Sequence, residues 1–179
     1  VLQHPVTNEY GEGFNQINQT LKAIEVFGKK GLQVVWLWPN VDAGSDDIAK
    51  GLRIFREKKN PDYIHFFKNF SPEDYARLIN SSSCIVGNSS SGLREGAFLG
   101  IPCVNIGSRQ NNRERASNVI DVGHDKVEIE KAIQTQLDHG RYDRSNLVGK
   151  GDAGLQIAEI LSSAKIDIKK SLNYLDNKQ

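Results

Sequence analysis

Short apolar runs alternate along the chain with longer stretches in which apolar residues recur every three or four positions. One such stretch, between the first two apolar runs, has a helical face formed by Phe14, Ile17, Leu21, Ile24 and Phe27. This alternation is typical of βαβ units that build a parallel sheet. It predicts strands over residues 1–4, 32–38, 63–67, 84–87, 103–106 and 119–122.

Local signals place the other helices. After Ser45, a second apolar helical face begins at Ile48. Ser71 supplies an N-cap, Pro72 suits the first helical position, and the acids that follow complete a capping box, so a third helix starts there. Further helices are predicted over residues 93–99, 126–137 and 153–164.

The composition suits one compact domain with a real core, because 38% of the 179 residues are hydrophobic and 25% are charged. The net charge is only +1, and basic and acidic residues are mixed throughout, so a nucleic-acid partner is not expected. The longest apolar run, residues 34–38, is far too short for a membrane span, and no basic-then-apolar leader opens the chain. We therefore expect a cytoplasmic protein without a membrane partner.

Cys84 and Cys103 lie in apolar stretches without a CxxC spacing, which favours buried thiols over a metal site or a disulfide. No metal or cofactor motif is recognised. The first predicted strand starts at residue 1 and the chain has no Met, so we expect a fragment of a longer protein, although removal of a tag would also explain the missing Met. Residues 165–179 form a polar tail that we expect to wrap or fray.

Polar residues follow five of the predicted strands. In an open parallel sheet, ligands bind at the carboxyl ends of the strands, so these loops are the place to search for a site. The loops span residues 4–7, 39–45, 68–71, 88–92 and 107–110, and all five are expected to open onto one edge of the sheet.

The fourth of these loops carries the strongest signal. The chain runs there through Asn88, then Ser89, Ser90 and Ser91, and then Gly92 into a helix. Backbone N–H groups and the dipole at a helix start attract phosphate, and serine hydroxyls add donors. An ordinary N-cap needs only one serine, so three of them favour phosphate binding over capping alone.

Charged residues near this loop suit a nucleotide. Glu95, about one turn into the helix, can accept hydrogen bonds from ribose hydroxyls or simply stabilise the helix dipole. Arg109 and Arg113 follow the fifth strand, where guanidinium groups suit a pyrophosphate, although either can be a solvated surface charge. Arg109 is the better candidate because it is nearer the strand end.

The remaining loops offer further candidates. His4 ends the first strand, and a near-neutral pKa makes it a candidate for proton transfer, while a structural hydrogen bond is the alternative. Asn40 and Asp42 can contact substrate or form an Asx-turn before the next helix, and the residues alone favour the turn. Phe70 can lie against a base ring or close the core.

Taken together, these loops resemble those of the hydrolysing UDP-N-acetylglucosamine 2-epimerases. The resemblance covers residues 1 to about 120 and rests on HPVT at 4–7, PNVDAGS at 39–45, GNSSSGLRE at 87–95 and NIGSRQ at 105–110. It implies an α/β fold, a Rossmann-like parallel sheet flanked by helices, like the C-terminal half of a glycosyltransferase-B type enzyme. Residues 1–179 then form a UDP-binding C-terminal domain, whose partners are a missing N-terminal domain and a UDP-sugar, in a parent enzyme expected to be a homo-oligomer.

The resemblance also implies roles for the candidate residues. UDP then lies on the serine loop, with Ser89 and Ser90 at the phosphates. Glu95 contacts the ribose, Arg109 lies near the pyrophosphate and Phe70 lies beside uracil. His4 and Asn40 then face the substrate.

In the reaction of that family, anti-elimination of UDP leaves a 2-acetamidoglucal, which is hydrated to N-acetylmannosamine for sialic-acid-type sugars. The hydrolysing branch is preferred because Pro5, Val6 and Thr7 follow His4 in place of the arginine-rich stretch usual in non-hydrolysing epimerases. The alternatives are UDP-diacetylbacillosamine as the substrate, a non-hydrolysing epimerase, a UDP-sugar glycosyltransferase half, or a UDP-binding module without turnover. The family also takes acid/base carboxylates from its first domain, so this fragment alone is expected to be inactive.

Overall fold

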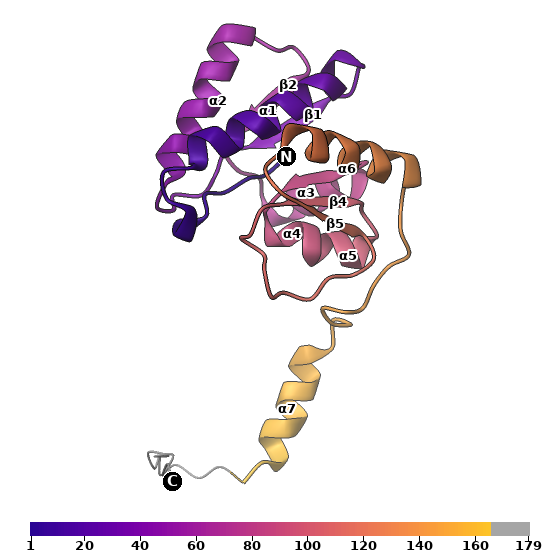
Figure 1. Cartoon of the computed structure of the whole chain (residues 1–179). Helices are drawn as coiled ribbons and strands as arrows, with labels where there is room; N and C mark the ends of the chain where they lie inside the picture. The colour runs from indigo at the N-terminus through magenta and orange to yellow at the C-terminus, as the bar shows by residue number, and fades with distance from the viewer. Residues whose placement is uncertain (166–179) are drawn as a thin grey trace, which may run out of the picture. The chain divides into compact units, whose positions relative to one another are not determined.

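The computed structural model describes residues 1–165, which fall into one unit over Val1–Val148 and a second that begins at Gly149 (Figure 1). The predicted polar tail lies, beyond Lys165, outside the described residues. The helices are η1 (Thr7–Glu9, a 3-10 turn), α1 (Gly13–Lys29), α2 (Ser45–Lys59), α3 (Pro72–Ser81), α4 (Ser90–Leu93), α5 (Glu95–Leu99), α6 (Lys126–His139) and α7 (Ala153–Ser163). The strands are β1 (Val34–Leu37), β2 (Ile64–Phe67), β3 (Ile85–Gly87), β4 (Cys103–Ile106) and β5 (Val119–Val122).

All strand pairings in the first unit are parallel. β1 pairs with β2, while β3, β4 and β5 form a second ladder in that order. The first residues of the chain connect the two ladders, because the N–H of Leu37 donates to the Val1 carbonyl at 3.0 Å and the N–H of Leu2 donates to the Val86 carbonyl at 2.9 Å. The spatial order is therefore β2, β1, the first segment, β3, β4, β5, which is the order of a doubly wound Rossmann-type sheet.

The predicted strand over residues 1–4 is wrong in extent, because its ladder is reduced to a single bridge at Leu2. The physical reason lies in Asn88. Its side-chain oxygen accepts from the backbone N–H of His4 at 2.7 Å, and its side-chain amide donates to the carbonyl of His4 at 2.9 Å. A side chain thus takes the place of a neighbouring strand, and the backbone groups of His4 are satisfied outside the ladder.

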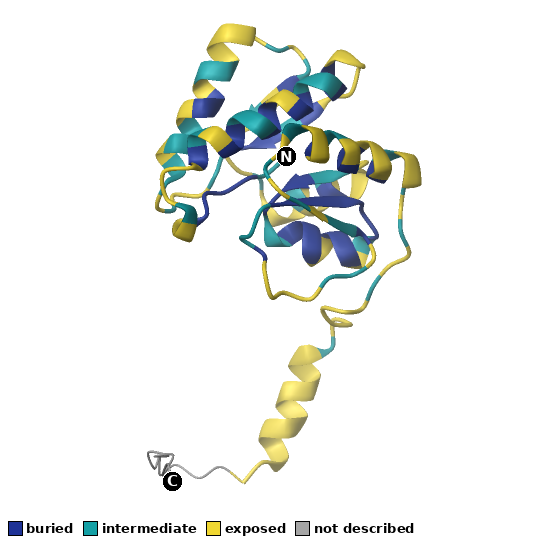
Figure 2. Ribbon diagram, viewed as in Figure 1, coloured by how far each residue is buried: buried dark blue, intermediate teal, exposed yellow. Residues whose placement is uncertain are grey.

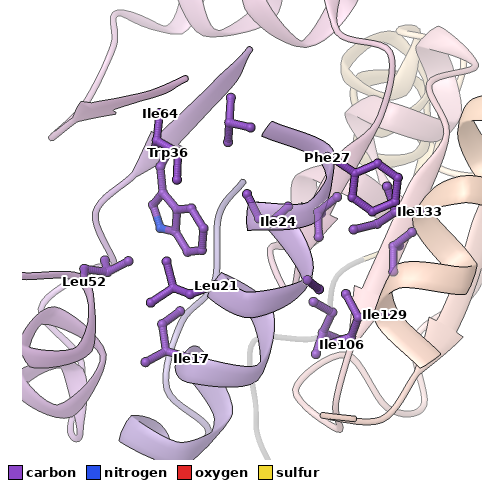
Figure 3. Packing of buried hydrophobic residues seen from close by; sticks show 14 of the residues in the cluster. Ile17, Leu21, Ile24, Phe27, Trp36, Leu52, Ile64, Ile106, Ile129 and Ile133 are labelled. Atoms are coloured by element: carbon purple, nitrogen blue, oxygen red, sulfur yellow. The ribbon is translucent and has the colours of Figure 1, made fainter. Parts of the chain in front are cut away.

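Helix α1 lies at the centre of the core. Its buried residues Ile17, Leu21, Ile24 and Phe27 lie between Trp36 of β1 and the α6 side of the unit, as Figure 3 shows. Figure 2 shows the same division along α1 and α6, whose buried positions face inward and whose outer faces are exposed. The helical face predicted from the three- and four-residue spacing is therefore confirmed.

The predicted helix over residues 93–99 is wrong at its start and in its continuity. Ser89 caps α4 by accepting from the N–H of Ser91, so the helix begins three residues earlier, at Ser90. At Arg94 the backbone has φ −104° and ψ −77°, and this departure divides α4 from α5. By contrast, Ser71 caps α3 by accepting from the N–H of Asp74, as its motif predicts.

Helix α7 belongs to the second unit and buries none of its residues. Its apolar side chains Leu155, Ile157, Ile160 and Leu161 are all exposed. Within residues 1–165, no helix combines the length and the apolar character that crossing a membrane requires.

Candidate functional site

A cavity of about 990 Å³ opens at the carboxyl ends of the first segment, β1, β2 and β3. Its wall includes five residues that the sequence singles out as ligand candidates: His4, Asn40, Phe70, Ser89 and Ser91. They come from four different strand-end loops, so the doubly wound order gathers residues up to 87 positions apart. A second cavity, of about 930 Å³, lies beside β5 and α6 and contains none of the predicted site residues.

His4 is almost fully buried, with 3% of its surface exposed. The backbone N–H of Asn40 donates to its Nδ1 at 3.2 Å, so Nδ1 carries a lone pair and the ring hydrogen is on Nε2. Burial lowers the pKa of His4 to about 4, with a further contribution from the nearby charge of Arg109. The expected near-neutral pKa is therefore wrong, and at pH 7 this imidazole is a neutral Nε2–H donor.

The serine loop is a connected group of hydroxyls. Ser89 Oγ accepts from the N–H of Ser91 at 3.3 Å and from the hydroxyl of Ser91 at 3.0 Å. The hydroxyl of Tyr75, on α3, is 2.7 Å from Ser91 Oγ. Ser91 is buried and bonded on both sides, whereas Ser89 and Ser90 are only partly buried. The outer part of the loop therefore consists of Ser89 and Ser90.

Arg109 lies beside this loop. Its Nη1 donates to the carbonyl of Asn88 at 3.2 Å, and its Nη2 is 3.9 Å from Asp42 Oδ2. Gln110 donates to the same carbonyl at 2.7 Å. Both members of the Arg109–Asp42 pair are partly exposed, so the pair itself contributes little stability. These contacts fix the Arg109 guanidinium next to Asn88, the residue before Ser89, where it can meet an anion bound at the serine loop.

Six of the predicted site residues are not part of the cavity wall: Asp42, Ser90, Gly92, Glu95, Arg109 and Arg113. Gly92 is buried, and a Cβ added to it would come within 2.4 Å of the sulfur of Cys103, so its small size serves the packing of α4 on β4. Glu95 is exposed at the start of α5. Arg113 is exposed in a turn after β4, and its carbonyl accepts from Arg115. The ligand contacts predicted for these residues stay predictions.

Phe70 is half-buried and packs against Phe67, with ring centroids 4.8 Å apart. This contact holds it at the cavity rim, next to Lys68. A flat ring at that position can accept a second ring on its open side.

Two site residues escaped the sequence reasoning. Tyr75 lies in the apolar stripe of α3, where an aromatic residue resembles ordinary core. Asn88 stands between a strand and three serines, and only the geometry shows that its side chain fixes the His4 backbone. The sequence offers one signal for these two residues, which is their position: Asn88 follows a strand end and Tyr75 faces one. Cys103 is a buried thiol, as predicted, whereas Cys84 is only partly buried. Within the described residues no cluster of His, Cys, Asp and Glu suits a metal ion.

Comparison with known proteins gives matches to one enzyme family. A family model described as UDP-N-acetylglucosamine 2-epimerase matches residues 1–162. The UDP-N-acetylglucosamine 2-epimerase of Neisseria meningitidis serogroup B is 30% identical over 149 residues, which are 83% of this chain and 38% of that protein. The UDP-N,N'-diacetylbacillosamine 2-epimerase (hydrolyzing) of Legionella pneumophila is 29% identical over 163 residues, which are 91% of this chain and 42% of that protein.

Among solved structures, the UDP-GlcNAc 2-epimerase of Methanocaldococcus jannaschii in complex with UDP-GlcNAc and UDP matches with a TM-score of 0.72 at 18% identity. The match covers 91% of this chain and 44% of that one, so the fold is one half of a glycosyltransferase-B type structure. This chain thus spans less than half the length of each of these proteins. Because the family model covers nearly the whole described part of the chain, the protein belongs to the UDP-N-acetylglucosamine 2-epimerase family.

Proposed function

We propose that this chain is the UDP-sugar-binding half of a hydrolysing UDP-N-acetylglucosamine 2-epimerase. The observation that carries the proposal is the convergence of His4, Asn40, Phe70 and Ser89 on one cavity, with Arg109 beside it. An aromatic ring, hydroxyl donors and a guanidinium are the groups that a uridine diphosphate requires.

In the proposed binding mode, the diphosphate lies against Ser89 and Ser90, and Arg109 approaches it from the side of Asp42. The uracil ring lies on the open face of Phe70. Glu95 and Arg113 are exposed and lie outside the cavity wall, so they reach the ligand only if it extends beyond that wall. Among the first backbone N–H groups of α4, those of Ser91 and Gly92 already donate to Ser89, so the N–H of Ser90 is the one that we propose as a further donor to the anion.

The reaction begins with loss of the proton on C2 and cleavage of the bond between C1 and the oxygen of the β-phosphate. The electron pair of that bond leaves with UDP, so negative charge builds on the departing diphosphate. Donors already aimed at that charge stabilise the transition state without reorganising, and this is the part that Ser89, Ser90 and Arg109 play. Water then adds across the resulting double bond and gives N-acetylmannosamine.

His4 faces the sugar side of the cavity as a neutral donor. Its Nδ1 is held by Asn40, and Nε2–H has no hydrogen-bond partner among the described residues. A neutral imidazole with a pKa of about 4 is a poor base at pH 7, so we assign it to hydrogen bonding with the substrate or the leaving group. The base that removes the C2 proton then comes from the remainder of the enzyme.

The hydrolysing branch is supported by Pro5, Val6 and Thr7, which follow His4 in place of an arginine-rich stretch. The name of the Legionella relative agrees with this choice. UDP-diacetylbacillosamine remains the competing substrate.

Two measurements test the proposal. Calorimetric titration of this chain should show binding of UDP and much weaker binding of CMP, and Ser89→Ala should weaken the UDP affinity. With the complete protein, UDP-N-acetylglucosamine should give free UDP and free N-acetylmannosamine. A product that keeps its nucleotide would move the protein to the non-hydrolysing branch, and a chain that does not bind UDP would refute the proposal.

A further inference from the structure

Three hydroxyl groups, two of them in the serine loop, form a chain that leads from helix α3 to the cavity. The Tyr75 hydroxyl is 2.7 Å from Ser91 Oγ, and Ser91 Oγ is 3.0 Å from Ser89 Oγ. All three residues line the cavity, although Ser91 is buried. No step of the proposed reaction uses Tyr75.

The direction of these hydrogen bonds follows from counting donors and acceptors. A serine oxygen has two lone pairs and one hydrogen. Ser89 Oγ accepts both the N–H and the O–H of Ser91, so both of its lone pairs are occupied. Its own hydrogen is then the only group that it can offer to a ligand.

The same count fixes the role of Tyr75. The single hydrogen of the Ser91 hydroxyl points to Ser89, so Ser91 Oγ must accept from Tyr75. Burial raises the pKa of the Tyr75 phenol, and the phenol therefore keeps its hydrogen at neutral pH. Tyr75 thus donates to Ser91 and Ser91 to Ser89, so the Ser89 hydrogen is the one left to turn toward a ligand in the cavity.

We infer that Tyr75 is a positioning residue that, through Ser91, holds the Ser89 hydroxyl as a dedicated donor to an anionic oxygen in the cavity. The inference rests on the proposed function, in which that oxygen belongs to the diphosphate of UDP. A donor with no accepting capacity left favours an oxyanion over a ligand hydroxyl that also needs an acceptor. Chains of hydrogen bonds also polarise one another, which strengthens the terminal donor.

A double-mutant cycle with UDP as the probe tests this role. We expect Tyr75→Phe to weaken UDP binding roughly three- to tenfold, because Ser91 then loses the donor that fixes its orientation and Ser89 loses its fixed direction with it. Ser89→Ala should weaken binding by roughly tenfold or more, since a hydrogen bond to a charged group is lost. In the Ser89→Ala background, Tyr75→Phe should have no further effect, because it acts only through Ser89.

Tyr142 provides the matched control. Its hydroxyl also donates a 2.7 Å hydrogen bond, to Gln136, but it does not line the cavity. Tyr142→Phe should leave the UDP affinity unchanged, and Ser91→Ala should reproduce the effect of Tyr75→Phe.

The outcomes separate this inference from the function on which it rests. If Tyr75→Phe leaves UDP binding unchanged, or if its effect persists in full in the Ser89→Ala background, the positioning role is refuted while UDP binding stands. An effect of Tyr142→Phe as large as that of Tyr75→Phe would also refute it, because the loss would then come from general destabilisation. If the unmodified chain does not bind UDP, the proposed function fails and the inference fails with it.

Discussion

Replacing Asn88 with alanine should be among the most damaging single changes to this site. The Asn88 side chain is fully buried and makes two hydrogen bonds to the backbone of His4, at 2.7 Å and 2.9 Å. The Asn88→Ala variant leaves the N–H and the carbonyl of His4 without these partners in a buried place. His4 then loses the anchor that sets its position at the cavity.

The magnitude follows from those two groups. A buried donor or acceptor left without a partner costs about 1–3 kcal/mol, so two of them lower the free energy of unfolding by about 2–6 kcal/mol. Domains of this size are stable by only about 5–15 kcal/mol, so this loss is a large fraction of the total and the variant should unfold at a much lower urea concentration.

Urea denaturation followed by circular dichroism measures this loss directly. Asn111→Ala is the control, because Asn111 is exposed and its replacement should change the free energy of unfolding by less than about 0.5 kcal/mol. A loss below about 1 kcal/mol for Asn88→Ala would refute the reasoning, since it would mean that water satisfies the His4 backbone as well as Asn88 does.

Three further predictions concern protonation and packing. The folded-state pKa of His4 is about 4 against an ordinary value of 6.5, so the unfolded chain binds more protons between these values. Stability should therefore fall as the pH drops from 6.5 to 4, by up to roughly 3 kcal/mol, and urea titrations of His4→Gln should show a flatter dependence. Gly92→Ala should cost about 1–3 kcal/mol because its new methyl group meets Cys103, whereas Gly154→Ala, with open space around it, should cost nothing in thermal melts. Burial raises the pKa of the Cys84 thiol to about 12 and raises that of Cys103 as well, so both should react slowly with a thiol reagent at pH 8 and rapidly in denaturant.

Local chemistry made several elements predictable from the sequence. Strands β4 and β5 lie where their apolar runs predict them, over residues 103–106 and 119–122. Helix α3 starts after Ser71 because serine, proline and acid each favour a helix start independently of the rest of the chain. Where one short stretch determines an element, the sequence is enough.

The gathering of the site was predictable for a different reason. Parallel strands bring their carboxyl ends to one edge, so loops after different strands meet there even though they are far apart in sequence. This rule places His4, Asn40, Phe70 and Ser89 around one cavity, as the structure confirms. It does not say which side chains face inward, and for that reason it does not separate Gly92 and Glu95 from the residues of the cavity wall.

The serine loop shows where such reasoning overcounts. Three hydroxyls in a row exceed what a helix cap needs, and the surplus suggests three phosphate ligands. The structure gives the hydroxyls different roles: Ser89 caps α4, the Ser91 hydroxyl donates to Ser89, and the Tyr75 hydroxyl lies 2.7 Å from Ser91 Oγ. Hydroxyls can bond to one another, so the donors that a loop presents to a ligand are fewer than the hydroxyls that it contains. The number of donors left for the ligand depends on residues such as Tyr75, and the sequence of its helix does not indicate this role.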